Sequence, residues 1–344
     1  MRRSEEEEME PMELDRFEWL AQRVETAIDP EQRIVDPHHH LWDRGGSTYL
    51  APQLLADLAA EHRVVKTVFV ECRAGYDRTA ASHLAPVGET EFVAAEAKIT
   101  DAESGPTIAA IVPFADMMLG DAVEEVVTAH VEAAGGRFRG IRHATSWDAS
   151  DEIENGHTRP SESMMLTPEF RAGVRRLATM GYSFDAWLYH PQLTELSELA
   201  AAVPEALIVV NHLGGPLQIG PYGRNQHEAH AHWRASMEGL ARQPNVVLKV
   251  GGIGLCTYFG MDWPRRPVPP GSEEVAAYWS DDVRWCIDRF GPDRCMFESN
   301  YPVDRQALTY PVLWNAFQII AATYDAAERD RLFAGTAEEI YRLG

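Results

Sequence analysis

One rhythm runs through most of this chain: a short apolar, β-branched run, a polar loop, and a stretch with helical spacing. The predicted strands are 34–36, 64–71, 107–113, 138–143, 183–188, 207–211, 246–250 and 295–299. The helical stretches between them include 90–102, 121–134, 168–180, 193–202, 228–242, 273–290 and 311–322. Eight strands that alternate with helices indicate a parallel sheet, and the number favours a closed (β/α)8 TIM barrel over an open doubly wound sheet.

The start of the sequence predicts an extension to this barrel. Residues 1–12 contain four consecutive glutamates and little apolar material, so we expect an acidic disordered tail. Leu14, Phe17, Leu20, Ala21 and Val24 then recur at helical spacing, which predicts an amphipathic helix docked on the rest of the chain. Residues 13–344 are expected to form a single domain, an α/β barrel with an N-terminal helical extension.

Charge and composition exclude several classes of partner. The net charge of −22 argues against a nucleic acid or an anionic membrane surface, because nothing offsets the repulsion from phosphates. No stretch approaches the ~20 apolar residues of a membrane-spanning helix. The four cysteines are too few for a disulfide scaffold and lack zinc-site spacing. We therefore expect a soluble cytoplasmic protein with a small-molecule partner; homodimerisation stays open.

The strongest candidate site is the run Asp36-Pro37-His38-His39-His40 at the end of the first predicted strand. Side chains alternate along a strand, so His38 and His40 should point to one face and His39 to the other. Two imidazoles on one face can hold a divalent metal or position a substrate carbonyl. The alternative is a set of hydrogen-bonded histidines in a tight corner.

Other polar residues also gather where predicted strands end. These residues are Glu71, Arg73, Arg142, His143, Trp187, His190, His212, Lys249, Glu298 and Asn300. The long irregular segments 145–166, 213–226 and 251–271 also come after predicted strands, and the third is interpreted as a lid or an oligomer contact. Strands of a barrel carry their site at the carboxyl end, so these residues should converge.

Several ordered pieces carry a family resemblance. They are the histidine run above, Arg139-Gly140-Ile141-Arg142-His143, His190-Pro191, Asn211-His212-Leu213-Gly214-Gly215-Pro216, Ser299-Asn300-Tyr301-Pro302 and Gly335-Thr336-Ala337. Over roughly residues 33–344 the chain resembles the amidohydrolase superfamily. It is most similar to the branch with sugar-acid lactonases, pyrone-dicarboxylate lactonase and metal-dependent decarboxylases.

The resemblance implies roles for individual residues. His38, His40 and His190 match ligands of one divalent metal, with zinc as the first candidate, and His212 matches the histidine that orients or protonates the reacting group. Asn300 stands where the family usually has an aspartate that acts as a base. An amide cannot accept a proton at neutral pH. The base is then Asp304, Glu298, Glu71 or His212, or the metal alone activates water. A further alternative is an enzyme without a metal, in which the histidines hydrogen-bond directly to the substrate carbonyl.

The leading hypothesis is a hydrolase of a small carboxylate-bearing lactone or a related ester or cyclic compound. Arg142, His143 and Arg73 would bind the substrate carboxylate, since a guanidinium matches two oxygens, and Glu71 lies among these substrate-binding candidates. Trp42, Trp187 and Tyr301 would form the pocket walls. A metal-dependent decarboxylase and a catalytically silent ligand-binding barrel are the alternatives.

Overall fold

The computed structural model describes residues 16–44 and 46–344, and the predicted acidic tail at 1–12 lies outside them. The described chain contains eight parallel strands in two runs. The first run orders β1 (Arg33–His39), β4 (Arg63–Val70) and β5 (Thr107–Val112). The second runs through β6 (Gly140–Ala144), β7 (Ser183–Trp187), β8 (Ile208–Val210), β9 (Val246–Val250) and β10 (Cys295–Phe297).

Two parallel bridges join these runs into a closed barrel. Ile111 pairs with Phe138 on one side, and His39 pairs with Tyr301 on the other. The second seam is reinforced where His40 N–H donates to Tyr301 O at 2.7 Å. All eight predicted strands are present, with ends that shift by a few residues. The predicted (β/α)8 barrel is therefore confirmed.

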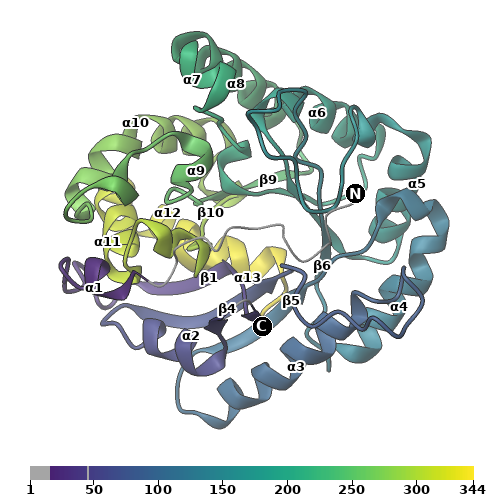
Figure 1. The fold of residues 1–344 in the computed structure, drawn as a ribbon, viewed down its shortest axis with the longest axis horizontal. Coiled ribbons are helices and arrows are strands. Elements are labelled where there is room, and N and C mark those ends of the chain that lie inside the picture. The colour runs from purple at the N-terminus through teal and green to yellow at the C-terminus, as the bar shows by residue number, and fades with distance from the viewer. Residues whose placement is uncertain (1–15, 45) are drawn as a thin grey trace, which may run out of the picture.

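Helices surround the barrel (Figure 1). The longer ones are α2 (Ala51–Leu58), α3 (Val87–Ala102), α4 (Val123–Ala133), α5 (Pro168–Thr179), α6 (Leu193–Ala202), α8 (Gln226–Ala241), α10 (Ser272–Phe290) and α11 (Tyr310–Ala321). Short elements are the β2 (Trp42–Arg44) and β3 (Ser47–Tyr49) hairpin, α7 (Gly220–Arg224), α9 (Cys256–Phe259), α12 (Ala326–Asp330) and α13 (Thr336–Ile340). Local signals set several helix starts: Thr167 Oγ1 accepts from Phe170 N–H before Pro168 opens α5. Within the described part of the chain, no helix is long and apolar enough to cross a membrane.

The inside of the barrel has an apolar layer and a buried polar layer. Strand residues such as Val35, Val68 and Val209 pack against Tyr341, which comes directly after α13. The Tyr341 hydroxyl donates to Asp185 Oδ2 at 2.8 Å, so the last turn of the described chain reaches into the barrel. Asp185 also accepts from Lys249 Nζ at 2.8 Å, and both of these side chains are fully buried.

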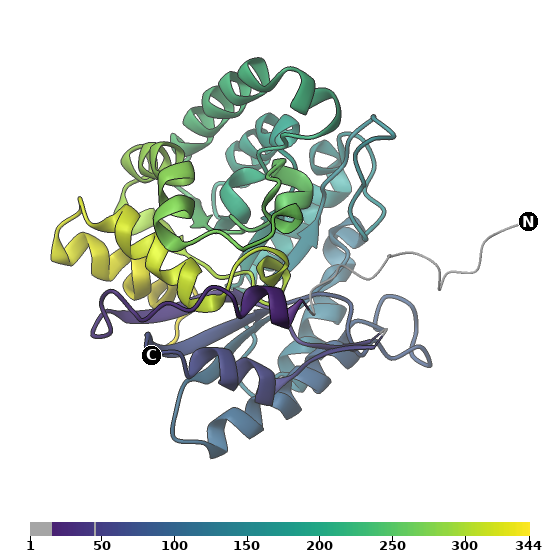
Figure 2. The ribbon, with the colours of Figure 1, turned by 60° about the vertical axis from the view of Figure 1, so that its left-hand side comes forward.

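The predicted N-terminal amphipathic helix is largely wrong. Leu14 lies outside the described residues; from Arg16 to Val24 only α1 (Phe17–Leu20) is helical, and Val24, expected on its apolar stripe, is 86% exposed. The segment instead runs along the 263–271 loop and α11, beside the yellow helices of Figure 2. Trp19 Nε1 donates to Arg266 O at 2.9 Å, and Ser272 N–H donates to Glu25 Oε1 at 2.9 Å. The loop that was expected to be a lid or an oligomer contact is therefore held by the chain's own N-terminal segment.

Candidate active site

Three buried histidines converge at the carboxyl end of the barrel. The ring of His38 lies 4.9 Å from that of His40 and 4.6 Å from that of His212, measured between centroids. His39 points the other way, with Nε2 3.0 Å from Thr67 Oγ1. The strand periodicity thus predicted correctly which two histidines share a face.

Asp36 anchors the strand end that carries these histidines. Its Oδ1 accepts from Ser299 N–H at 3.0 Å and its Oδ2 from Ser299 Oγ at 2.6 Å. These bonds join β1 to the segment after β10 and so fix both ends of the site. Burial raises the pKa of Asp36 to about 6, although the hydrogen bonds from Ser299 act in the opposite direction.

Glu298 connects two of the three imidazoles. Its Oε1 accepts from His212 Nδ1–H at 2.7 Å, and its Oε2 lies 2.6 Å from His38 Nδ1. Burial lowers the pKa of both histidines, and the charge of Lys249 lowers that of His38 further. The two rings are therefore held neutral, with each Nε2 directed away from the carboxylate.

The backbone around this carboxylate requires two glycines. A Cβ on Gly251 would lie 2.2 Å from Glu298 Cγ, and one on Gly252 would lie 2.7 Å from His212 Cγ. His212 and Asn300 themselves adopt left-handed φ values of 51° and 54°. Such conformations cost energy in non-glycine residues and cluster at functional sites.

His40 and Asn300 bring two lone-pair atoms together. His40 Nδ1 donates to Val70 O at 2.8 Å, so its Nε2 carries a lone pair, and Asn300 Oδ1 lies 3.1 Å from that Nε2. In this orientation Asn300 Nδ2 donates to Asp304 Oδ1 at 2.8 Å, which directs Oδ1 toward His40. Asp304 is in turn fixed by Gly254 N–H at 2.7 Å, and burial raises its pKa well above the ordinary value.

This donor set fits a divalent cation. The ligand atoms of His38, His212 and Glu298 all lie within 4.8 Å of one another. The facing lone pairs of His40 and Asn300 repel each other unless a cation or a proton lies between them. Nitrogen and oxygen donors of these kinds are ligands that zinc accepts.

Arg142, which was expected to bind a substrate carboxylate, is already engaged by protein groups. Its Nε donates to Glu71 Oε1 at 2.8 Å, and its Nη1 donates to His38 Nε2 at 3.3 Å. Burial opposes the ionisation of Glu71, but the charges of Arg142 and His157 outweigh it and lower its pKa. Glu71 therefore serves as an ionised support behind Arg142.

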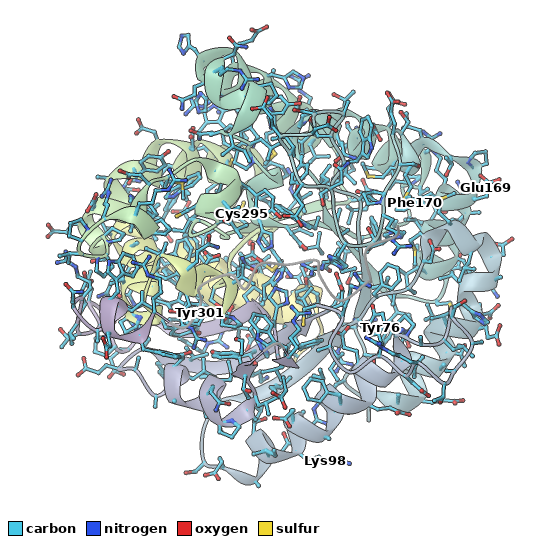
Figure 3. The ribbon with its side chains drawn as sticks, in the orientation of Figure 1. Tyr76, Lys98, Glu169, Phe170, Cys295 and Tyr301 are labelled. Carbon is cyan, nitrogen blue, oxygen red and sulfur yellow. The ribbon has the colours of Figure 1, made fainter. Side chains whose placement is uncertain are left out.

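Two other predicted contacts point away from the cluster. His143 lies on the face of β6 opposite Arg142, where its ring packs 5.3 Å from that of Phe170, and its Nδ1 accepts from Met117 N–H. Figure 3 places Phe170 on the inner side of α5, with Glu169 farther out. Tyr301 packs against Tyr310 and donates to Leu308 O at 2.7 Å. Neither placement fits the predicted substrate contact, because both side chains lie in the protein core.

The contacts of His190 are made with groups outside the His38, His40 and His212 cluster. Its ring packs 4.8 Å from that of Tyr222, and its Nδ1 accepts from Leu217 N–H at 3.2 Å. A neutral imidazole that accepts at Nδ1 carries its proton on Nε2 and has no second lone pair for a metal. This arrangement does not fit the predicted ligand role.

The remaining candidates border the site. Trp187 packs edge-on against His212, with ring centroids 4.8 Å apart, and against Tyr258. Trp42 stacks on His40 at 6.5 Å, and Arg73 is exposed and donates to His157 O at 3.3 Å. Trp187 and Trp42 thus flank the two histidines, whereas Arg73 secures a loop.

Two groups in this region had no assigned role in the hypothesis drawn from the sequence. Lys249 stands at a predicted strand end, but the sequence does not reveal its buried partner Asp185, because both alternate faces of a parallel strand are largely apolar. His157 lies in the irregular 145–166 loop, and its Nε2 is 3.1 Å from Glu71 Oε2. No periodicity applies to a loop, so only its length pointed to that segment.

Comparisons with known proteins agree with this geometry. The family model described as Amidohydrolase matches residues 35–343. The chain belongs to the amidohydrolase family. The uncharacterized protein y4mH of Sinorhizobium fredii is 32% identical, over 90% of this chain and 98% of that protein. An L-fucono-1,5-lactonase of Burkholderia multivorans is 27% identical, over 90% of this chain and 96% of that enzyme.

A solved structure extends the likeness to this amidohydrolase's fold. An amidohydrolase of Burkholderia multivorans, crystallised with bound zinc, superposes with a TM-score of 0.70 and 25% identity, covering 90% of this chain and 99% of the other. Family membership, the lactonase relative and the barrel together make this protein a hydrolase. The metal bound in that relative agrees with the donor set described above.

Proposed function

We propose that this amidohydrolase opens a small, uncharged lactone, such as that of a sugar acid, by hydrolysis. The observation that carries the proposal is the convergence of His38, His40 and His212 with Asn300 in one buried cluster at the carboxyl end of the barrel. The lactonase relative supports the substrate class.

An uncharged ring fits better than the carboxylate-bearing substrate expected from the sequence. Arg142 is bonded to Glu71 and His38, and Arg73 to the backbone of His157. The rings of Trp187 and Tyr258 would instead offer flat apolar faces beside His212. Aromatic faces suit a lactone ring, because they exclude water around the carbonyl.

His212 would remove the proton from the attacking water. Its Nδ1–H is held by the Glu298 carboxylate, which leaves Nε2 as the acceptor and stabilises the imidazolium that forms. His212 would thus act as the base in place of the aspartate that Asn300 replaces, and Glu298 would hold the His212 ring in position. Asp304 would act by fixing the Asn300 amide and not as the base.

A divalent cation, with zinc as the first candidate, would be held by His40 Nε2 and Asn300 Oδ1, whose lone pairs face each other. When bound, it would polarise the lactone carbonyl. Elemental analysis of protein purified without chelator tests this part. Less than about 0.1 equivalent of metal and full activity in chelator would contradict it, and the histidines would then be direct hydrogen-bonding partners.

The activity is tested with a panel of uncharged sugar-acid lactones, carboxylate-bearing lactones and hydroxybenzoates. We expect acid release from the uncharged lactones and no CO2 from the hydroxybenzoates. His212→Asn should lower kcat about 10²–10⁴-fold, the usual contribution of a general base. His83→Gln, which changes a histidine with a 37% exposed side chain, is the control. CO2 release without acid release would establish a decarboxylase instead.

A further inference from the structure

A second histidine–carboxylate pair lies beside the first, at the solvent boundary of the barrel. His157 Nε2 is 3.1 Å from Glu71 Oε2, and the side chains of His157 and Glu71 are 33% and 0% exposed. Contacts then lead inward, from Glu71 to Arg142 at 2.8 Å and from Arg142 to His38 at 3.3 Å. A half-exposed imidazole is thus fixed by a buried carboxylate that connects to the histidine cluster.

The loop that carries His157 is held in place by its own contacts. Gly156 N–H donates to Ser146 O at 2.7 Å, and Thr158 Oγ1 donates to Ala144 O. Arg73 Nη1 donates to the carbonyl of His157 itself at 3.3 Å. The two residues that flank His157 and its own carbonyl are therefore tied to the barrel, which orients the ring before any substrate arrives.

The pair also leaves one side of the imidazole available. Glu71 occupies the Nε2 side, and Nδ1 makes no hydrogen bond within residues 16–44 and 46–344. Glu71 is kept ionised, since the charges of Arg142 and His157 lower its pKa against the effect of burial. With Nε2 donating to the Glu71 carboxylate, the imidazolium form of His157 carries a second N–H at Nδ1 and can donate it.

We infer that His157, held by Glu71, is the general acid that protonates the leaving ring oxygen of the lactone. The inference rests on the proposed lactone hydrolysis and supplies its second proton transfer. Opening a lactone expels an alkoxide, and an alkoxide leaves far more readily when it is protonated as the bond breaks.

Two proton transfers accompany the ring opening. The water oxygen bonds to the carbonyl carbon while His212 Nε2 takes one proton from that water. The bond between this carbon and the ring oxygen then breaks, its electron pair goes to the ring oxygen, and that oxygen receives the Nδ1 proton of His157. The product is the hydroxy acid. Exchange with solvent returns one proton to His157 and removes one from His212.

A pair of substrates separates this role from a structural one. His157→Gln should lower kcat on a sugar-acid lactone about 10²-fold or more. The same variant should lose less than about 5-fold on an aryl lactone such as dihydrocoumarin, because a phenolate leaves without a proton. A structural role would lower both rates by the same factor, and that result would overturn the inference.

The pH–rate profile gives a second, independent readout. The charged or titratable groups that face His157 are Glu71, Arg73, Arg142 and His143. The variant retains all four, so a difference between its pH–rate profile and that of the wild type comes from the loss of His157. A general acid must be protonated, so wild-type kcat should fall on the alkaline side, and His157→Gln should remove that fall. An unchanged alkaline limb in the variant would contradict the assignment.

The matched control is another half-exposed histidine–carboxylate pair. His230 Nε2 lies 2.8 Å from Asp282 Oδ1, with a histidine side chain 37% exposed, between α8 and α10. His230→Gln should leave both rates and the profile unchanged. If the wild-type protein opens no lactone at all, the proposed function fails; if it does and His157→Gln keeps full kcat, only the role of His157 fails.

Discussion

Glu89 is fully buried near the start of α3, and its two oxygens differ in their partners. Oε1 accepts from Cys72 N–H at 3.0 Å and from Ala74 N–H at 2.7 Å, whereas Oε2 has no hydrogen-bond partner in the described part of the chain. Burial, followed by the charge of Glu71, raises the pKa of Glu89 to about 8. The folded protein therefore keeps a proton on this carboxyl at neutral pH.

This proton should make stability depend on pH. Between the ordinary value of 4.5 and about 8, the folded state holds a proton that the unfolded chain has released. Stability from this group is then complete below about pH 4.5 and is lost as the pH rises to about 8. One pKa unit is worth about 1.4 kcal/mol, so we expect a loss of a few kcal/mol over this range.

Glu89→Gln keeps the Oε1 acceptor and removes the titration. Urea unfolding at pH 5, 6, 7 and 8 should show a smaller fall in free energy for the variant than for the wild type. Glu124→Gln, at a carboxylate 50% exposed on α4, is the control and should keep the wild-type slope. Parallel curves for Glu89→Gln and the wild type would contradict the assignment of this pH dependence.

Single residues also show how far the sequence alone predicts this site. The two-residue period of a strand placed His38 and His40 on one face, because the side chain of His39 between them points to the other face. The same period could not say which of Arg142 and His143 faces inward, since both faces of a buried parallel strand are covered. His190 failed for another reason: the backbone N–H of Leu217 occupies its Nδ1, and that contact depends on tertiary structure.

Among the elements, the barrel strands were predictable and the N-terminal segment was not. Eight apolar runs are strong local signals. The segment from Phe17 to Val24 has helical spacing, but its neighbourhood makes hydrogen bonds to other parts of the chain in place of helical ones. Trp19, Arg23 and Glu25 bond to the 263–272 stretch, so tertiary contacts replace helical ones. Helix propensity is a weak prior that such contacts override.

Truncation at two points tests this docked segment. Removing residues 1–12 should change the melting temperature by less than about 2 °C, because that acidic stretch has little to bury. Removing 1–27 should lower it by about 4–8 °C through loss of the buried Trp19 and its neighbours. Thermal unfolding followed by circular dichroism measures both.

Point variants distinguish the effect of the docked side chains on the melting temperature from the effect of shortening the chain. Trp19→Ala should reproduce about half of the loss, since this indole is 8% exposed. Val24→Ala, at a side chain 86% exposed, should leave the melting temperature unchanged. A large effect from removing 1–12 alone would show that the acidic stretch is docked as well.

For the whole molecule, the buried polar layer inside the barrel connects distant parts of the chain. Asp185 from β7 accepts from Lys249 of β9, from Asn211 at 3.2 Å and from Tyr341. Breaking a buried ion pair by removing one partner costs about 3–5 kcal/mol, because the other charge stays uncompensated. Asp185→Asn should lower the free energy of unfolding by that amount.

A second change should recover most of that loss. Adding Lys249→Met to Asp185→Asn removes the uncompensated cation, and we expect the double variant to lie within about 1–2 kcal/mol of the wild type. Chemical denaturation of the two single variants and the double variant measures the coupling. Strict additivity of the single losses would show that the two side chains do not act as a pair.

The position of Tyr341 has a consequence for the order in which the chain is made. A ribosome produces Asp185 and Lys249 well before it produces Tyr341, whose hydroxyl bonds to that same aspartate. A nascent chain that already contains all eight strands therefore still lacks the side chain that fills the barrel floor. The polar centre of the barrel therefore gains this partner only after Tyr341 has left the exit tunnel.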